Sequence, residues 1–178
     1  MKKKKINIQD ICFIGLAAAI ICIMAPFSFP MPLGVPMTLQ TFIIPLAAIV
    51  LGAKRGALAT LLYILLGALG LPVFANFTGG WQSIVGPSGG FILSFPIMAY
   101  LIGLGMDYRS RYRGALLLGI ILGNTVNLVS GTILYCFVSK VTFITSFTAC
   151  VLPFLPITVL KMILAWTIGL NIKARIVD

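Results

Sequence analysis

The chain has 178 residues, of which 60% are hydrophobic and only 9% are charged. A soluble domain carries about 25% charged residues, so this composition excludes a soluble fold. It predicts an all-α polytopic membrane protein, with residues 1–178 forming one membrane-embedded domain. The formal net charge is +10, but the basic residues flank apolar runs and form no basic helix face. We therefore expect the lipid bilayer, and not nucleic acid, as their partner.

The chain begins with the lysine run Lys2 to Lys5, which precedes an apolar segment from Ile11 to Phe29. This order is also typical of a signal peptide, but the apolar segment continues past the possible cleavage site at Ala17–Ala19. Four small residues lie along it: Gly15, Ala18, Ala19 and Cys22. They can let another helix approach closely, or can simply be the small residues common in membrane helices.

Prolines and glycines divide the remaining chain into five more apolar segments. The expected helices cover residues 11–29, 37–52, 57–69, 91–106, 114–138 and 148–170. Pro45 is expected to kink the second, and Pro153 and Pro156 to interrupt the last near its start. Lys54 to Gly56 is expected to form a short basic turn. The prediction is thus a bundle of six transmembrane helices.

The distribution of basic residues orients this bundle. With the N-terminus inside, 11 of the 13 basic residues lie on the inner side and Lys140 alone lies outside. Lys161 falls within the last helix. The positive-inside rule therefore predicts that both termini are inside, and that the long loop between the third and fourth helices is outside.

That loop, Gly70 to Gly90, has no charged residue and contains several aromatic ones. A solvated linker would be rich in charged residues and serine, so we interpret the loop as the lid of a binding pocket. Ser88 is expected to cap the fourth helix, and the free N–H groups at Gly89 and Gly90 favour a carboxylate there.

Lys161 is the most informative residue of the sequence. A lysine within a membrane helix costs about 2.5–3.5 kcal/mol on insertion scales, and no acidic residue lies within the membrane to compensate it. Its amine can either reach an interface or face a polar cavity that holds an anionic or strongly polar ligand. We favour the cavity.

Other uncharged residues are candidates for the same pocket: Gln40, Asn76, Trp81, Asn124 and Asn127. Trp81 can equally belong to an interfacial aromatic belt, and for Asn124 and Asn127 we favour hydrogen bonds between helices. The sequence has no P-loop, no histidine and no cysteine pair with metal-ligand spacing. We therefore expect neither an enzyme nor a cofactor or metal site.

Several sequence blocks resemble the BioY family, the biotin-binding S components of energy-coupling-factor (ECF) transporters. The blocks are Val35-Pro36-Met37-Thr38-Leu39-Gln40-Thr41, Leu51-Gly52-Ala53-Lys54-Arg55-Gly56-Ala57, Gly70-Leu71-Pro72-Val73-Phe74-Ala75, Gly86-Pro87-Ser88-Gly89-Gly90-Phe91, and Pro153-Phe154-Leu155-Pro156 through Lys161. In that family the last helix usually contains Pro-Gly-Asp-x-x-Lys. Here Thr158 takes the place of the aspartate, so it can form hydrogen bonds but cannot neutralise Lys161.

The resemblance implies a prokaryotic plasma-membrane protein that binds biotin from outside, under a roof of outer loops. Polar contacts are then expected from Gln40, Asn76, Thr158 and Lys161, with backbone N–H groups near Ser88, Gly89 and Gly90, while Phe74 and Trp81 shape an apolar wall. The implied partners are a transmembrane coupling protein and two ATPase subunits, with Gly15, Ala18, Ala19 and Cys22 as the docking face. A different vitamin or small carboxylate as ligand, and a purely structural subunit, remain the alternatives.

Overall fold

The computed structural model describes residues 7–29 and 35–177, and these ranges are almost entirely helical. The long helices are α1 (Ile8–Met24), α2 (Gln40–Leu51), α3 (Ala53–Ala68), α5 (Gly89–Asp107), α6 (Ala115–Ser139) and α8 (Leu155–Val177). The short elements are β1 (Ser28–Phe29), β2 (Met37–Thr38), the 3-10 turn η1 (Ala75–Phe77), α4 (Trp81–Val85) and α7 (Phe143–Cys150). The strands β1 and β2 pair antiparallel.

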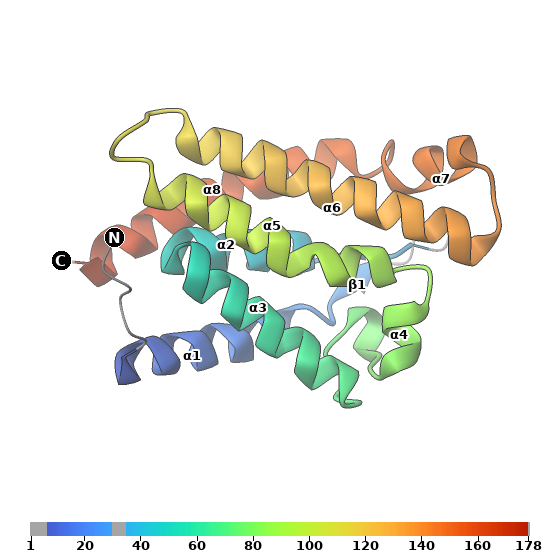
Figure 1. Ribbon diagram of the computed structural model, residues 1–178, viewed down its shortest axis with the longest axis horizontal. Helices are drawn as coiled ribbons and strands as arrows, with labels where there is room; N and C mark the ends of the chain where they lie inside the picture. The colour runs from blue at the N-terminus through green and yellow to red at the C-terminus, as the bar shows by residue number, and fades with distance from the viewer. Residues whose placement is uncertain (1–6, 30–34, 178) are drawn as a thin grey trace.

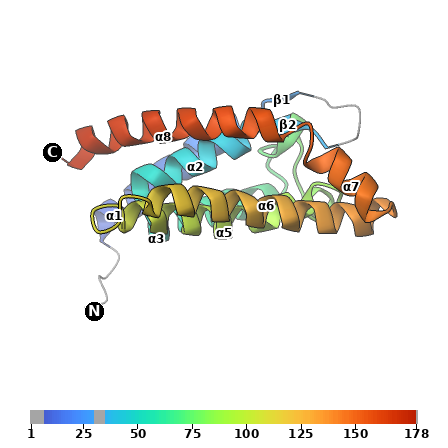
Figure 2. The ribbon, with the colours of Figure 1, turned by 90° about the horizontal axis from the view of Figure 1, so that it is seen from above.

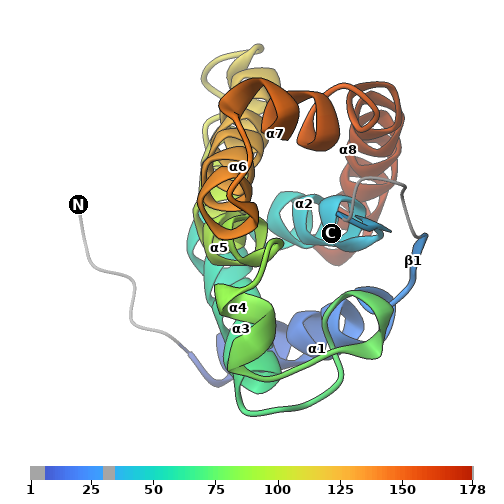
Figure 3. The same ribbon diagram turned by 90° about the vertical axis from the view of Figure 1, so that its right-hand side faces the viewer.

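The long helices form a bundle along the longest axis of the molecule (Figure 1). The start of α1 and the end of α8, which are the termini of the described chain, lie at one end, whereas α4, α7 and β1 lie at the opposite end. Seen from that opposite end, α5 and α6 form one side, α8 and α1 lie apart from each other, and α2 lies between them (Figure 3). The view from above shows α8 beside α2 on the side away from α5 and α6 (Figure 2).

Three helical segments are long and apolar enough to cross a bilayer, namely Gly89–Asp107, Ala115–Ser139 and Leu155–Arg175. The helices α1 and α2 are apolar but shorter. The prediction of a helical membrane protein is therefore confirmed.

Glycines allow α5 and α6 to pack closely. A Cβ atom on Gly119 would lie 2.6 Å from the Leu101 carbonyl oxygen, and one on Gly90 would lie 2.3 Å from the Ser130 carbonyl oxygen. Real Cβ atoms do not approach backbone oxygens this closely, so larger residues would push the helices apart. The bundle core beside this contact is apolar and contains the fully buried Phe95 and Met98.

The N-terminal helix begins and ends earlier than predicted. Asn7 and Asp10 form a capping box, so α1 begins at Ile8 and not at Ile11. It ends at Met24, short of the predicted Phe29, because Pro26 lacks the N–H group that would continue the helix.

The predicted basic turn at Lys54 to Gly56 is wrong, since these residues lie in the first turn of α3. The chain reverses at Gly52 instead, whose φ of +83° suits glycine. The Ala53 N–H that follows donates to the Asp107 carboxylate at 3.1 Å, which satisfies a free group at the start of α3.

The last predicted helix is two helices. Residues 143–150 form α7, residues 151–154 form a turn that contains Pro153, and α8 continues to Val177, beyond the predicted end at Leu170. The expected N-cap residue of α5 is correct, but its side chain does not cap the helix. Ser88 occupies the N-cap position of α5 with helical backbone angles, and its side chain makes no capping hydrogen bond.

Candidate functional site

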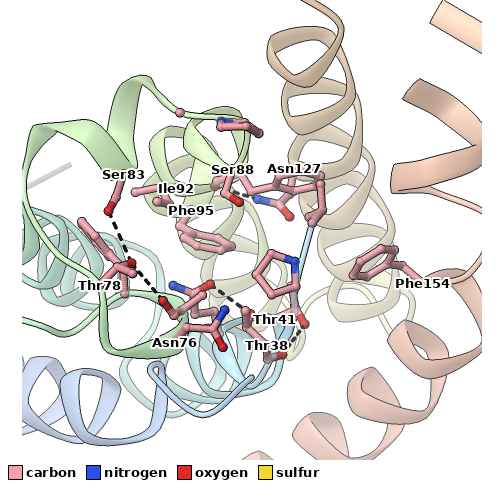
Figure 4. A pocket seen from close by; sticks show the side chains of 18 of the residues that line it. Thr38, Thr41, Asn76, Thr78, Ser83, Ser88, Ile92, Phe95, Asn127 and Phe154 are labelled. Atoms are coloured by element: carbon pink, nitrogen blue, oxygen red, sulfur yellow. Dashed lines mark hydrogen bonds between the residues drawn. The ribbon is translucent and has the colours of Figure 1, made fainter. Parts of the chain in front are cut away.

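A cavity of about 240 Å³ lies at the end of the bundle that carries the short elements (Figure 4). Its position follows from the length of α2. Twelve residues make a helix of about 18 Å, whereas the 19 residues of α5 cover about 28 Å. Because α2 begins late, its neighbours extend beyond it, and the segment between α3 and α5 covers the space that remains.

The cavity is lined by aromatic side chains and by uncharged polar ones. The apolar part includes Phe74, Phe91, Ile92, Phe95 and Phe154. The polar part consists of Thr38, Gln40, Thr41, Asn76, Thr78, Gln82, Ser83, Ser88, Asn124, Asn127 and Thr158. These residues come from β2, α2, the lid segment, α5, α6 and the start of α8.

Gln40, the first residue of α2, is held by two hydrogen bonds. Its Oε1 atom accepts from the Thr38 hydroxyl at 2.9 Å, and its Nε2 atom donates to the Tyr63 hydroxyl of α3. Tyr63 is fully buried and packs edge-on against Phe74, with ring centroids 5.6 Å apart. The amide is therefore oriented before any ligand arrives, with one N–H and one lone pair still available.

Lys161 is anchored to residues of the cavity wall without lining the cavity itself. Its ammonium donates to the Thr38 carbonyl oxygen at 2.7 Å and to the Thr41 hydroxyl at 3.3 Å. These bonds connect α8 to the start of α2 and partly satisfy a charge that is only half-exposed. Thr158, three residues earlier on α8, does line the cavity.

The lid is fastened to the segment that follows α1. The Asn76 N–H donates to the Pro26 carbonyl oxygen at 3.0 Å, and the Ser28 hydroxyl donates to Asn76 Oδ1 at 2.7 Å. Phe27 and Phe77 meet edge-on, with ring centroids 5.7 Å apart. Asn76 adopts a left-handed φ of 56°, a conformation that asparagine tolerates better than most residues.

Asn127 of α6 both lines the cavity and joins two helices, which are the two roles that the sequence left open for it. Its Nδ2 atom donates to the Phe91 carbonyl oxygen at 3.0 Å and to the Ser94 hydroxyl at 2.8 Å, so it joins α6 to α5. Asn124 instead donates to Ile120 of its own helix. Both residues line the cavity.

The structure brings together five of the predicted site residues in the cavity lining: Gln40, Phe74, Asn76, Ser88 and Thr158. Trp81 is 68% exposed and lies outside the lining. Gly89 and Gly90 also lie outside it, where they allow close packing against Ile84 and Ser130. Lys161 lies outside the lining as well, but its ammonium donates to Thr38 and Thr41, which line the cavity.

Sequence reasoning missed the aromatic face of α5 and the polar face of the lid. Phe91 and Phe95 are one helical turn apart, and this i, i+4 spacing could have identified a common face. Gln82 and Ser83 carried no comparable signal, because α4 is only five residues long.

The small residues of α1 divide between two faces. Gly15 and Ala19 are exposed, and a Cβ atom on Gly15 would meet nothing within 4 Å. Ala18 is buried and Cys22 is partly buried against the core. Only the first pair is thus open to a partner in this structure.

Comparisons with known proteins point to one family. The chain is 36% identical over 166 residues to the biotin transporter BioY2 of Lactococcus lactis, covering 92% of this chain and 90% of that protein. It is 46% identical over 106 residues to the biotin transporter BioY of Thermotoga maritima, and that match spans 60% of this chain and 62% of that protein. The relatives are thus named as transporters.

The fold gives the same result. A crystal structure of the S-component for biotin from an ECF-type ABC transporter superposes with a TM-score of 0.84 at 26% identity. The superposition covers 94% of this chain and 92% of the other. The BioY family model matches residues 1–178. The chain belongs to the BioY family.

Proposed function

We propose that this protein is the membrane-embedded substrate-binding subunit of an ECF-type, ATP-driven importer, and that it binds biotin from the outer face. The observation that carries this proposal is the covered cavity with its neutral polar and aromatic lining. It occurs in a chain that shares the fold of a biotin S-component over nearly its whole length.

The lining suits the chemistry of biotin. The ligand has a neutral urea ring, an apolar thiophane ring and an apolar chain that ends in a carboxylate. Oriented amides such as Gln40 and Asn127 can donate to and accept from a urea, while Phe74 and Phe95 can pack against the apolar parts.

The charge distribution supports six membrane-spanning helices with both termini inside. Arg109, Arg111 and Arg113 lie between α5 and α6 at the end that holds the termini, and Lys140 lies after α6 at the cavity end (Figure 1). The positive-inside rule places the arginine-rich end in the cytoplasm of a prokaryotic cell and the cavity toward the outside.

The chain shows no P-loop, so in this proposal the ATP that drives import is hydrolysed by partner subunits. The partners that we propose are a transmembrane coupling protein and two ATPase subunits. The exposed pair Gly15 and Ala19 on α1 is the part of the predicted docking face that a partner helix can approach closely.

Isothermal titration of the detergent-purified chain tests the proposal. We expect saturable, one-site binding of biotin without ATP. Titration with lipoate and other vitamins provides the comparison. A vitamin that binds and is not displaced by excess biotin would replace biotin as the ligand, and absence of any saturable binding would contradict the proposal.

A further inference from the structure

The lid segment, residues 70–90, has two chemically different faces. All of its Asn, Gln, Ser and Thr side chains line the cavity: Asn76, Thr78, Gln82, Ser83 and Ser88. Figure 4 shows Thr78 and Ser83 on this polar face. Four apolar side chains lie outside the cavity lining and are 46–68% exposed: Leu71, Phe77, Trp81 and Val85. We call these four the apolar face of the lid. A loop in water normally carries its polar groups on the outside, so this face indicates apolar surroundings.

The apolar face continues the exposed apolar surface of α3. This helix exposes four leucines at spacings of three or four residues, which form one stripe: Leu58, Leu61, Leu65 and Leu69. Leu69 is 84% exposed, and Gly70 alone separates it from Leu71 of the lid. An exposed leucine stripe on a helix of a membrane protein faces lipid. No charged residue lies between Arg55 and Asp107, so no charge separates this stripe from the lid.

The end of α1 joins the same surface. Leu16, Ile20 and Ile23 of this helix are exposed. Phe27, which follows the helix and is 54% exposed, packs edge-on against Phe77 of the lid. Figure 3 shows α1, α3 and α4 on one side of the bundle, away from α8. The lid thus extends the apolar surfaces of two neighbouring helices.

The length of α3 sets the depth of the lid. Lys54 and Arg55 in the first turn of α3 mark the membrane surface at the far end, because charges avoid hydrocarbon. The 16 residues of α3 cover about 24 Å, whereas the hydrocarbon core of a bilayer is about 30 Å thick. The lid therefore begins near the hydrocarbon boundary and not far out in water. Irregular backbone is unstable in hydrocarbon, so the headgroup level suits both its backbone and its apolar side chains.

We propose that the apolar face of the lid is an interfacial membrane anchor, which inserts among the phospholipids beside the cavity end of the bundle. Trp81 suits this position because its ring is apolar and its N–H can donate to headgroups or water. The polar face of the same segment then closes the cavity. Lipid is the occupant, and not a protein partner, because the face continues surfaces that contact lipid. The anchor does not depend on which molecule fills the cavity.

Depth-dependent quenching of tryptophan fluorescence tests this proposal. The chain has two tryptophans, so Trp166→Phe leaves Trp81 as the single reporter. The full-length variant is placed in phospholipid nanodiscs, where water reaches both faces of the bilayer. Nitroxide-labelled phosphatidylcholine carries the quencher at the headgroup, on the upper acyl chain or at the chain end, and iodide quenches from water. We expect the headgroup and upper-chain labels to quench Trp81 most, and iodide to quench it several-fold less than free tryptophan.

The matched control is Trp81→Phe, which leaves Trp166 as the reporter. Trp166 lies near the middle of α8, about 16 Å from the cavity end of this helix. We expect the chain-end label to quench Trp166 most, so that the order of the labels reverses between the two variants. The same order of labels in both variants would contradict the proposed depth of Trp81.

Two further variants compare the faces of α4. In the chain that lacks both tryptophans, Val85→Trp places a reporter on the apolar face and Gln82→Trp places one on the polar face. We expect Val85→Trp to follow Trp81, and Gln82→Trp to be quenched more by iodide than by any lipid label. Equal lipid quenching at the two positions would contradict the division into two faces.

One result would overturn the proposal outright. If iodide quenches Trp81 as strongly as free tryptophan and the lipid labels have no effect, the face lies in water and is left for a protein partner. This outcome is independent of biotin binding, so it would leave the proposed function intact. Should the variants at Gln82 and Val85 not fold, the single substitution Trp166→Phe decides.

Discussion

The polar groups at the two ends of the bundle have different kinds of partners. At the end that holds the termini, carboxylates make the contacts: Asp10 forms an ion pair with Arg55, and Asp107 accepts from the Ala53 N–H. At the cavity end, Lys161 donates to a carbonyl and a hydroxyl, and Gln40 bonds to a tyrosine.

The difference follows from what each end must do. Carboxylates at helix ends join α1, α3 and α5, and each has a cation or a backbone N–H as its partner. A carboxylate in the cavity wall would have to be desolvated each time a neutral ligand bound. Neutral hydrogen bonds can fix the wall and leave the interior without charge.

We expect the largest loss of stability from a substitution at the contact between α5 and α6. A Cβ atom on Gly90 would lie 2.3 Å from the Ser130 carbonyl oxygen and 2.8 Å from Leu134 Cβ. We expect Gly90→Ala to destabilise the protein by about 1–3 kcal/mol or more, measured by thermal unfolding in detergent. The control is Gly15→Ala, which has open space; equal melting temperatures for the two variants would contradict the packing account.

The lysine anchor should have the next largest effect. Lys161→Met removes two charge-assisted hydrogen bonds to the start of α2, which are worth about 1.5–3 kcal/mol. We therefore expect biotin affinity to fall by roughly 10- to 100-fold in a titration. Lys140→Met, in the turn after α6, should leave the affinity unchanged, and a similar loss in both variants would show a general effect of charge.

The buried tyrosine should have a smaller effect that acts through Gln40. Tyr63→Phe removes the acceptor of the Gln40 amide, and we expect biotin affinity to fall by about three- to tenfold. In a double-mutant cycle, Tyr63→Phe should have almost no further effect once Gln40→Ala is present. Additive losses would contradict this dependence, and Tyr100→Phe on exposed α5 surface is the matched control.

The ion pair at the opposite end should have the smallest effect. Arg55 is 36% exposed and Asp10 only 13%, but the Asp10 carboxylate keeps a hydrogen bond from the Asn7 N–H, so Arg55→Ala should cost about 1 kcal/mol of stability. Biotin affinity should not change, because the pair lies at the other end of the bundle. A loss of affinity without a loss of stability would show that the two ends are coupled.

The sequence predicted the membrane class and the BioY family, because composition and short sequence blocks carry both. It also placed the lid and Gln40, since an uncharged glycine-rich loop and a polar helix start are local features. The positions of helix ends were less predictable. Whether Gly52 or Lys54 breaks the helix depends on Asp107, which is distant in sequence.

The contacts of Lys161 were also hard to predict from the sequence. A lysine in an apolar helix indicates a polar neighbour, but its acceptors lie on β2 and α2, more than 100 residues away. Gly89 and Gly90 similarly resemble a helix start that could bind an anion. Their closeness to Ile84 and Ser130 becomes visible only once the helices are packed.

A structure of the purified chain with biotin bound tests the central claim most directly. We expect ligand density in the cavity beneath the lid, within hydrogen-bond distance of Gln40 or Asn127. Biotin bound outside this cavity would contradict the proposed site.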